Sequence, residues 1–330
     1  MPFPMPRPMS GSRLAPKTRM MIKRMMMSSG SPTRPSIRPS SCYGRRPDLI
    51  TLLGCAALAL AAAAGAAQFT SGVNVVEVYA AVTDRTGQPI MGLTRDDFTV
   101  LEDGAAQTVS VFAAGDFPLS VAIAIDRSFS MSGDRLALAK SAARTFLGEL
   151  RPSDQAMIIA VGSDTETVAP LSADRQAQYA ALTRLDSWGT TGLYDAVIRA
   201  IDAIQTAKGR RALVLLSDGN DRYSEASAAD ALAKARRSDV MIYPIALGRE
   251  RPVVFAELAT LTGGRSFQSS RPQELNTILQ TIASELRHQY LLGYSPSRPI
   301  VQGEEQWRSI AVRVNRPDVT VRARDGYLAK

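Results

Sequence analysis

The 330-residue chain is poor in cysteine and histidine, and this scarcity excludes several kinds of site. Its 2 cysteines cannot form a disulfide framework or a zinc site built from two CxxC pairs. A single histidine excludes a His-rich metal centre and leaves only His288 as a base for a Ser-His-Asp arrangement. Because His288 lies near the end of a predicted helix, we expect it to be structural. The chain also lacks a phosphate-binding GxxxxGKS/T loop, a GxSxG elbow and a GxGxxG loop after a strand.

Acidic residues are nearly missing from the first 48 positions. The net charge of +8 would suit a nucleic-acid or anionic-membrane partner if it were spread over the chain. Residues 1–48, however, contain 10 basic residues and 1 acidic residue, whereas the remaining chain has 29 basic and 30 acidic residues. This leader is rich in Met, Pro and Ser and has no apolar periodicity, so we predict that it is disordered. The rest of the chain is near neutral, and a nucleic-acid partner loses its support.

An uncharged, alanine-rich apolar run follows the leader at residues 49–67. The basic pair Arg45-Arg46 before it and the small residues Ala64-Gly65-Ala66 at its end are typical of a secretory signal peptide. We therefore expect an exported protein that is periplasmic, at the cell surface or secreted. A signal this far from Met1 suggests that translation starts later than residue 1.

Two alternatives remain for the same apolar run. It is at the short end of the length that spans a bilayer, so an uncleaved membrane anchor is the first alternative. The sequence Leu52-Leu53-Gly54-Cys55 resembles a bacterial lipobox, so lipidation at Cys55 is the second. Cleavage near Ala66 would remove both cysteines of the chain.

Two flanking sections, residues 73–115 and 289–330, show the alternation of apolar and polar residues that is typical of β-strands. Val76, Val78, Ala80 and Val82 form one such series, and a turn from Asp84 to Pro89 follows. The two flanks are expected to pair into one small β-sandwich, because the ends of an inserted domain tend to lie close together.

Between these flanks, residues 118–288 alternate strands with helices. The first strand, Leu119–Ile125, is a continuous apolar run, which is typical of a strand buried on both faces. The predicted strands are 119–125, 156–161, 166–170, 212–216, 240–247 and 266–267. The predicted helices are 135–150, 175–185, 193–204, 226–237, 254–261 and 274–286. This alternation predicts an α/β fold with a doubly wound, mostly parallel six-stranded sheet and helices on both faces.

Oxygen-bearing side chains follow the ends of two of these strands. Asp126-Arg127-Ser128-Phe129-Ser130 follows the first strand, Ser217-Asp218-Gly219 follows the fourth, and Thr191 precedes the third helix. With the strand order 3-2-1-4-5-6, the first and fourth strands are neighbours at the switch point where such sheets bind ligands. Two carboxylates and three hydroxyls are hard donors that suit Mg²⁺, Mn²⁺ or Ca²⁺ rather than Zn²⁺. The candidate metal ligands are therefore Asp126, Ser128, Ser130, Thr191 and Asp218.

This pattern resembles the metal-ion-dependent adhesion site of von Willebrand factor type A domains, and the resemblance extends from about residue 118 to 288. It implies that Ser128 and Ser130 bind the ion directly, and that Thr191 binds it directly or through water. It implies that Asp126 and Asp218 bind largely through water. Where the family usually has glycine between the two serines, this chain has Phe129, which would cap the site or offer an apolar contact.

The flanks resemble those of bacterial, acidobacterial-type proteins with the same domain. The motifs that carry this resemblance are Asp84–Leu93, Asp97–Gly104, Tyr290–Tyr294 and Val321–Tyr327. Together the two resemblances cover nearly all of the chain beyond the leader and the apolar run.

The resemblance implies a protein-binding or adhesion role rather than an enzyme, with no catalytic residues. In this interpretation a divalent cation completes its coordination with an Asp or Glu of a protein partner, and a membrane is contacted only through an uncleaved signal or a lipid anchor. One alternative is a metal-dependent hydrolase, for which Asp221 is the only candidate base near the ion. The other is a structural component of envelope assembly with a vestigial metal site.

Overall fold

The computed structural model describes residues 75–115, 117–301 and 303–330. The chain divides at residue 70, and the unit 71–330 contains all of these residues. The predicted leader, 1–48, and the apolar run, 49–67, lie outside the described residues. None of the helices in the described part combines the length and the hydrophobicity that crossing a membrane requires.

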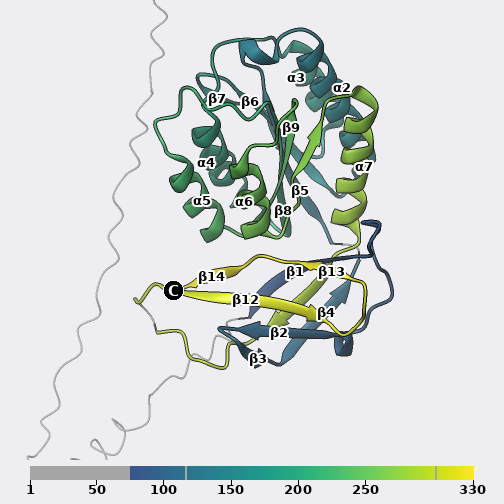
Figure 1. The fold of residues 1–330 in the computed structure, drawn as a ribbon, viewed down its shortest axis with the longest axis vertical. Helices are drawn as coiled ribbons and strands as arrows, with labels where there is room; N and C mark the ends of the chain where they lie inside the picture. The colour runs from purple at the N-terminus through teal and green to yellow at the C-terminus, as the bar shows by residue number, and fades with distance from the viewer. Residues whose placement is uncertain (1–74, 116, 302) are drawn as a thin grey trace, which may run out of the picture. The chain divides into compact units, whose positions relative to one another are not determined.

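A six-stranded sheet forms the centre of the α/β section (Figure 1). Its strands are β5 (Leu119–Asp126), β6 (Gln155–Val161), β7 (Thr165–Ser172), β8 (Arg210–Ser217), β9 (Val240–Leu247) and β10 (Phe267–Ser269). They lie in the order β10-β9-β8-β5-β6-β7, and all neighbours are parallel except β6 and β7. This is the predicted order 3-2-1-4-5-6, so β5 and β8 flank the switch point. The predicted fold class is confirmed.

Six helices cover the two faces of this sheet (Figure 1). They are α2 (Asp134–Glu149), α3 (Arg175–Arg184), α4 (Leu193–Ile204), α5 (Ala228–Arg237), α6 (Val253–Thr262) and α7 (Pro272–Arg287). Side chains of α2, α3 and α7 share one hydrophobic cluster with the sheet, and those of α4, α5 and α6 share the other.

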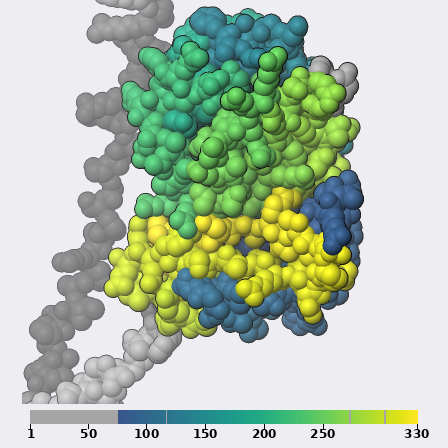
Figure 2. Space-filling model, in the orientation of Figure 1, coloured from purple at the N-terminus to yellow at the C-terminus, as the bar shows by residue number. Residues whose placement is uncertain are grey.

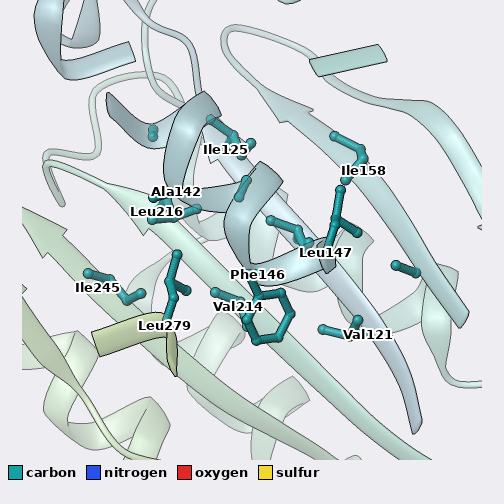
Figure 3. Close-up of a cluster of buried hydrophobic side chains, with 14 of the residues drawn as sticks. Val121, Ile125, Ala142, Phe146, Leu147, Ile158, Val214, Leu216, Ile245 and Leu279 are labelled. Carbon is teal, nitrogen blue, oxygen red and sulfur yellow. The ribbon is translucent and has the colours of Figure 1, made fainter. Parts of the chain in front are cut away.

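Strand β5 contributes to both clusters. Val121 and Ile125 lie in the first one, together with Phe146 of α2 (Figure 3), whereas Ala122 and Ala124 lie in the second. Every residue of β5 is buried, which explains why its sequence shows no alternation of polar and apolar side chains.

The two flanks together build a pair of antiparallel four-stranded sheets. The first flank supplies β1 (Val76–Thr83), β2 (Phe98–Glu102), β3 (Ala105–Gln107) and β4 (Val109–Ala114). The second flank supplies β11 (Tyr290–Tyr294), β12 (Gln306–Val314), β13 (Thr320–Arg322) and β14 (Gly326–Ala329). The sheet orders are β13-β1-β11-β4 and β14-β12-β2-β3, so each sheet mixes strands of both flanks. One hydrophobic cluster lies between them, and its completely buried members are Val78, Ala80, Val100, Leu292 and Tyr294.

Polar side chains join this sandwich to the α/β section, where residues of the C-terminal flank lie against the helices and strands (Figure 2). Glu285 of α7 accepts a hydrogen bond from the Tyr243 hydroxyl of β9 at 2.8 Å and forms an ion pair with Arg322 of β13. Burial raises the pKa of Tyr243 well above its ordinary value, so this phenol remains a donor. Arg236 of α5 pairs with Asp325 at 3.0 Å.

Gly264 lies where the chain returns from α6 to the sheet, at a position that has no room for a side chain. A Cβ at this position would be 2.0 Å from the carbonyl oxygen of Ile242 in β9. We expect Gly264→Ala to lower the free energy of unfolding by about 1–3 kcal/mol, because the collision is with sheet backbone that has no room to move. Urea unfolding measures the effect. Gly248→Ala is the matched control, since a Cβ there meets nothing within 4 Å; equal losses in the two variants would contradict the prediction.

Candidate metal centre

The ends of β5 and β8 bring the predicted donor residues to one edge of the sheet. Ile125 pairs with Leu216 in the parallel ladder, so the next residues, Asp126 and Ser217, stand beside each other. Asp218 follows directly in the turn after β8. This edge is at the switch point of the sheet, which is where doubly wound folds place ligands.

The Asp126 carboxylate is completely buried and lies at the centre of a hydrogen-bond cluster. One of its oxygens, Oδ1, accepts the backbone N–H of Ser128 at 2.9 Å. The other, Oδ2, accepts the hydroxyls of Ser217 at 2.6 Å and Thr191 at 3.3 Å. Burial raises the pKa of Asp126 above its ordinary value, hydrogen bonds from Ser217 and Ser128 oppose the rise, and the Asp218 charge adds to it. A cation beside Asp126 would relieve the cost of this buried charge.

The predicted hydroxyl donors lie around this carboxylate. The oxygens Oγ of Ser128 and Ser130 are 3.1 Å apart, and Ser128 and Thr191 are both buried. Asp218 is half-buried, and its Oδ1 accepts the backbone N–H of Asn220 at 3.1 Å. The structure therefore places all five predicted residues at the same sheet edge, with Asp126 at the end of β5 and the other four in three loops.

Backbone hydrogen bonds hold these three loops together. The Phe129 N–H donates to the Gly189 carbonyl at 3.0 Å, and the Tyr223 N–H donates to the Thr191 carbonyl at 3.1 Å. Gly189 has a φ of +74°, and a Cβ there would be 2.6 Å from the Ser163 hydroxyl. A glycine is required at this position because both the backbone conformation and the close approach disfavour a side chain.

Ser217 belongs to the cluster, although no sequence pattern distinguishes it from the other serines. Its hydroxyl donates to Asp126 and accepts the N–H of Gly219 at 3.0 Å, so it links the two strand ends. The ladder register was the signal that could have identified it, because only the register places residue 217 opposite residue 126.

Asp221, the candidate base of the hydrolase alternative, is engaged at the start of α4. Its Oδ1 accepts the N–H of Leu193 at 2.8 Å and the hydroxyl of Ser224 at 2.6 Å. The helix otherwise begins at Gly192, which has no capping side chain. Asp221 thus accepts a backbone N–H that has no partner within α4, and its negative charge lies at the positive end of the helix dipole. His288 ends α7, and its Nδ1 lies 2.7 Å from the carbonyl of Ser284, in agreement with a structural role.

The donor set determines which ions suit this site. The described ranges contain no group of three or more His, Cys, Asp and Glu side chains placed to hold a metal. An ion at the Asp126 cluster would depend on two carboxylates and several hydroxyls, which are oxygen ligands that fit Mg²⁺, Mn²⁺ or Ca²⁺. Two carboxylates also balance the charge of one divalent ion.

Residues 121–220 match the family model of the von Willebrand factor type A domain. This match begins inside β5 and ends just after Asp218, so it spans all the candidate donors. The chain contains a von Willebrand factor type A domain. Families of this kind often mediate protein interactions through a metal-ion-dependent adhesion site.

Two curated relatives of the domain, each called UPF0353 protein, come from Mycobacterium marinum and Mycobacterium ulcerans. Each is 26% identical to this chain, over 52% of this chain and 62% of its own length. The chain thus spans less than two thirds of the relatives that it matches.

Solved structures that resemble this chain are more distant in sequence. The von Willebrand factor type A protein from Catenulispora acidiphila is 17% identical, with a TM-score of 0.48 over 68% of this chain and 71% of that one. An aerotolerance-related membrane protein from Bacteroides fragilis is 19% identical, with a TM-score of 0.44 over 51% and 98%. Proximal thread matrix protein 1 from the mussel byssus, described with a zinc-occupied site, is 15% identical, with a TM-score of 0.47 over 56% and 49%.

Proposed function

We propose that this type A domain binds one divalent cation, Mg²⁺, Mn²⁺ or Ca²⁺, and through it an acidic side chain of a protein partner. The observation that carries the proposal is the hydrogen-bonded cluster of oxygen donors around the buried Asp126 carboxylate, at the switch point of the sheet. The protein is proposed to act by binding and not by catalysis, since Asp221 is committed to the start of α4.

Each residue has a distinct part in this proposal. Ser128, Ser130 and Thr191 would hold the ion with neutral oxygens, and Asp126 and Asp218 would supply the compensating negative charge. Because hydroxyls are weak ligands, the bound ion would stay electrophilic and keep a position for a carboxylate from outside. Such a carboxylate, belonging to an Asp or Glu of the partner, would complete the coordination.

We also propose that the protein is exported, on the basis of residues 45–67. The basic pair, the apolar run and the small residues at its end support a cleaved signal peptide. Mass spectrometry of the protein isolated from its native cells would test this, and recovery of peptides from residues 1–60 in the finished protein would contradict it.

Ser130→Ala tests the metal site with little risk to the fold, because Ser130 is exposed. We expect Mg²⁺ affinity to fall about tenfold, since one oxygen donor and its hydrogen bond to Ser128 are lost. Titration calorimetry with magnesium, manganese and calcium chlorides measures the affinity and the preferred ion.

Ser132→Ala is the matched control, since Ser132 is an exposed serine in the same loop whose N–H bonds to the Phe129 carbonyl. Its Mg²⁺ affinity should equal that of the unsubstituted protein. The assignment of the site would be overturned if none of the three ions bound to the unsubstituted protein, or if the two variants had equal Mg²⁺ affinities.

A further inference from the structure

Large apolar side chains that are strongly exposed gather around the candidate metal centre. Among the described residues of the α/β section there are four of them: Phe129 at 64%, Trp188 at 46%, Tyr223 at 60% and Val253 at 73%. All four follow the carboxyl ends of strands or lie in the loops packed against them. We call these four residues the apolar rim.

The backbone connects three members of the rim to donor residues or to Arg127, which lies between two of them in the chain. Phe129 stands between Ser128 and Ser130 in the chain, and the Tyr223 N–H donates to the Thr191 carbonyl. Trp188 donates its N–H to the carbonyl of Arg127 at 2.7 Å.

Val253 begins α6 directly after Pro252, and Pro252 touches the turn that carries Asp218. A Cβ on Gly219 would be only 2.1 Å from Cγ of Pro252. The apolar rim is therefore held in place by the same loops as the donors. Exposure of apolar side chains to water is unfavourable, and aromatic side chains gathered at one site are typical of protein interfaces.

Three arginines stand among the rim residues. The Arg127 guanidinium lies over the Trp188 ring at 5.5 Å from its centroid, and its Nε is buried without a hydrogen-bond partner among the described residues. Arg135 donates to the Ser130 carbonyl at 3.1 Å, and Arg222 is exposed next to Tyr223.

Acidic side chains lie nearby as well. Asp221 and Asp195 are engaged by backbone N–H groups, and Glu166 lies 3.6 Å from Arg127 at a largely exposed position. The preference for an acidic partner segment over a basic one therefore comes from the proposed cation, and the arginines could pair with further carboxylates of that segment.

We propose that the partner presents an acidic residue with a large apolar side chain within two positions of it. The carboxylate would bind the cation, and the apolar side chain would lie on Phe129 and Trp188 of the apolar rim. This inference rests on the proposed function and adds the chemistry of the partner to it. The rim would supply affinity by burying apolar area, and the ion would supply the requirement for an acid.

A library of random 12-residue peptides displayed on phage tests this inference. The immobilised protein selects peptides in the presence of MgCl₂, and bound phage are released with EDTA. We expect the released peptides to contain Asp or Glu with Phe, Trp, Tyr, Leu or Ile within two positions. Acidic peptides without this apolar enrichment would overturn the inference and leave the proposed function intact.

The peptide of consensus sequence is then synthesised and titrated by fluorescence anisotropy. Phe129→Ala and Trp188→Ala are each expected to weaken its binding at least about tenfold, while calorimetry shows unchanged Mg²⁺ affinity. Met91→Ala and Val301→Ala, which truncate side chains that are 58% and 56% exposed on the β flanks, should leave peptide binding unchanged.

Three results would overturn the inference or its basis in a distinguishable way. Unchanged peptide affinity in both rim variants would overturn the rim alone. Magnesium binding without any magnesium-dependent peptide would overturn the partner chemistry. Failure of the unsubstituted protein to bind Mg²⁺ would overturn the proposed function itself.

Discussion

Asp126→Asn is expected to weaken Mg²⁺ binding by at least about a hundredfold and yet leave the metal-free domain as stable as before. The substitution removes one of the two charges that would balance the ion, and even residues that only orient metal ligands are typically worth ten- to a hundredfold. The metal-free fold should tolerate it, because the buried carboxylate is costly there and its pKa is already raised by burial.

The hydrogen bonds around residue 126 also survive this change. The Asn Oδ1 can keep the N–H of Ser128. Its amide group can donate to the hydroxyls of Ser217 and Thr191, which then accept from residue 126 instead of donating to it. A fall in Mg²⁺ affinity of this variant would therefore not be caused by unfolding of the domain.

Thermal unfolding with and without magnesium provides the measurement. A ligand present at 100 times its dissociation constant stabilises the folded state by about 2.7 kcal/mol, so the unsubstituted protein should gain several degrees in Tm. Asp126→Asn should gain at most about 0.4 kcal/mol. Asp186 is an exposed aspartate in the loop before Thr191, and Asp186→Asn should gain as much as the unsubstituted protein. Equal magnesium effects in all three proteins would contradict the assignment of Asp126.

Glu102→Ala is expected to cost about 3–5 kcal/mol of unfolding free energy, because it breaks a buried ion pair by removing one partner. Glu102 at the end of β2 pairs with Arg308 of β12 at 2.9 Å, and their side chains are only 3% and 2% exposed. Removing the carboxylate leaves a guanidinium that cannot lose its proton buried inside the sandwich.

The same carboxylate also connects the two sheets. Its Oε2 accepts the hydroxyls of Tyr294 on β11 at 2.8 Å and of Tyr327 on β14 at 2.9 Å. Burial and these bonds raise the pKa of Tyr327 to about 12, so the phenol stays protonated and continues to donate. Glu102→Ala would leave both hydroxyls without this acceptor.

Urea unfolding tests the prediction against an exposed pair. Glu305 lies 3.3 Å from Lys330 with both side chains more than half exposed, and Glu305→Ala should cost less than about 1 kcal/mol. The double variant Glu102→Leu with Arg308→Met should recover much of the loss, because no buried charge is left uncompensated. Equal losses for Glu102→Ala and Glu305→Ala would show that the buried pair is not important for stability.

The sequence predicted the α/β section well because its signals are local. The apolar run 119–125 corresponds to β5, and the predicted helix 193–204 has the observed bounds of α4. The strand order was also correct, and with it the meeting of Asp126 and Asp218 at one edge.

The interactions that the sequence missed depend on contacts between distant residues. Glu102 and Arg308 are separated by 206 positions, and neither lies in a pattern that distinguishes it from a surface charge. Ser217 joins the cluster only through the register of β8 on β5. Of the apolar rim, only Phe129 was expected to offer an apolar contact. Trp188, Tyr223 and Val253 were not predicted, since sequence does not show which apolar side chains remain exposed at a loop.

The position of β1 has a consequence for the order of folding. This strand, from the first flank, lies between β11 and β13, which are both from the second. While the ribosome is still synthesising residues before 290, β1 therefore has neither of its neighbours. The α/β section has no such delay, since all its strands precede residue 270. Folding of the α/β section would bring the end of β4 to the start of β11, where Ala114 pairs with Tyr290. This would lower the entropic cost of closing the long loop between the two flanks. We therefore expect the α/β section to fold first in the nascent chain, and the strands of the two flanks to pair afterwards.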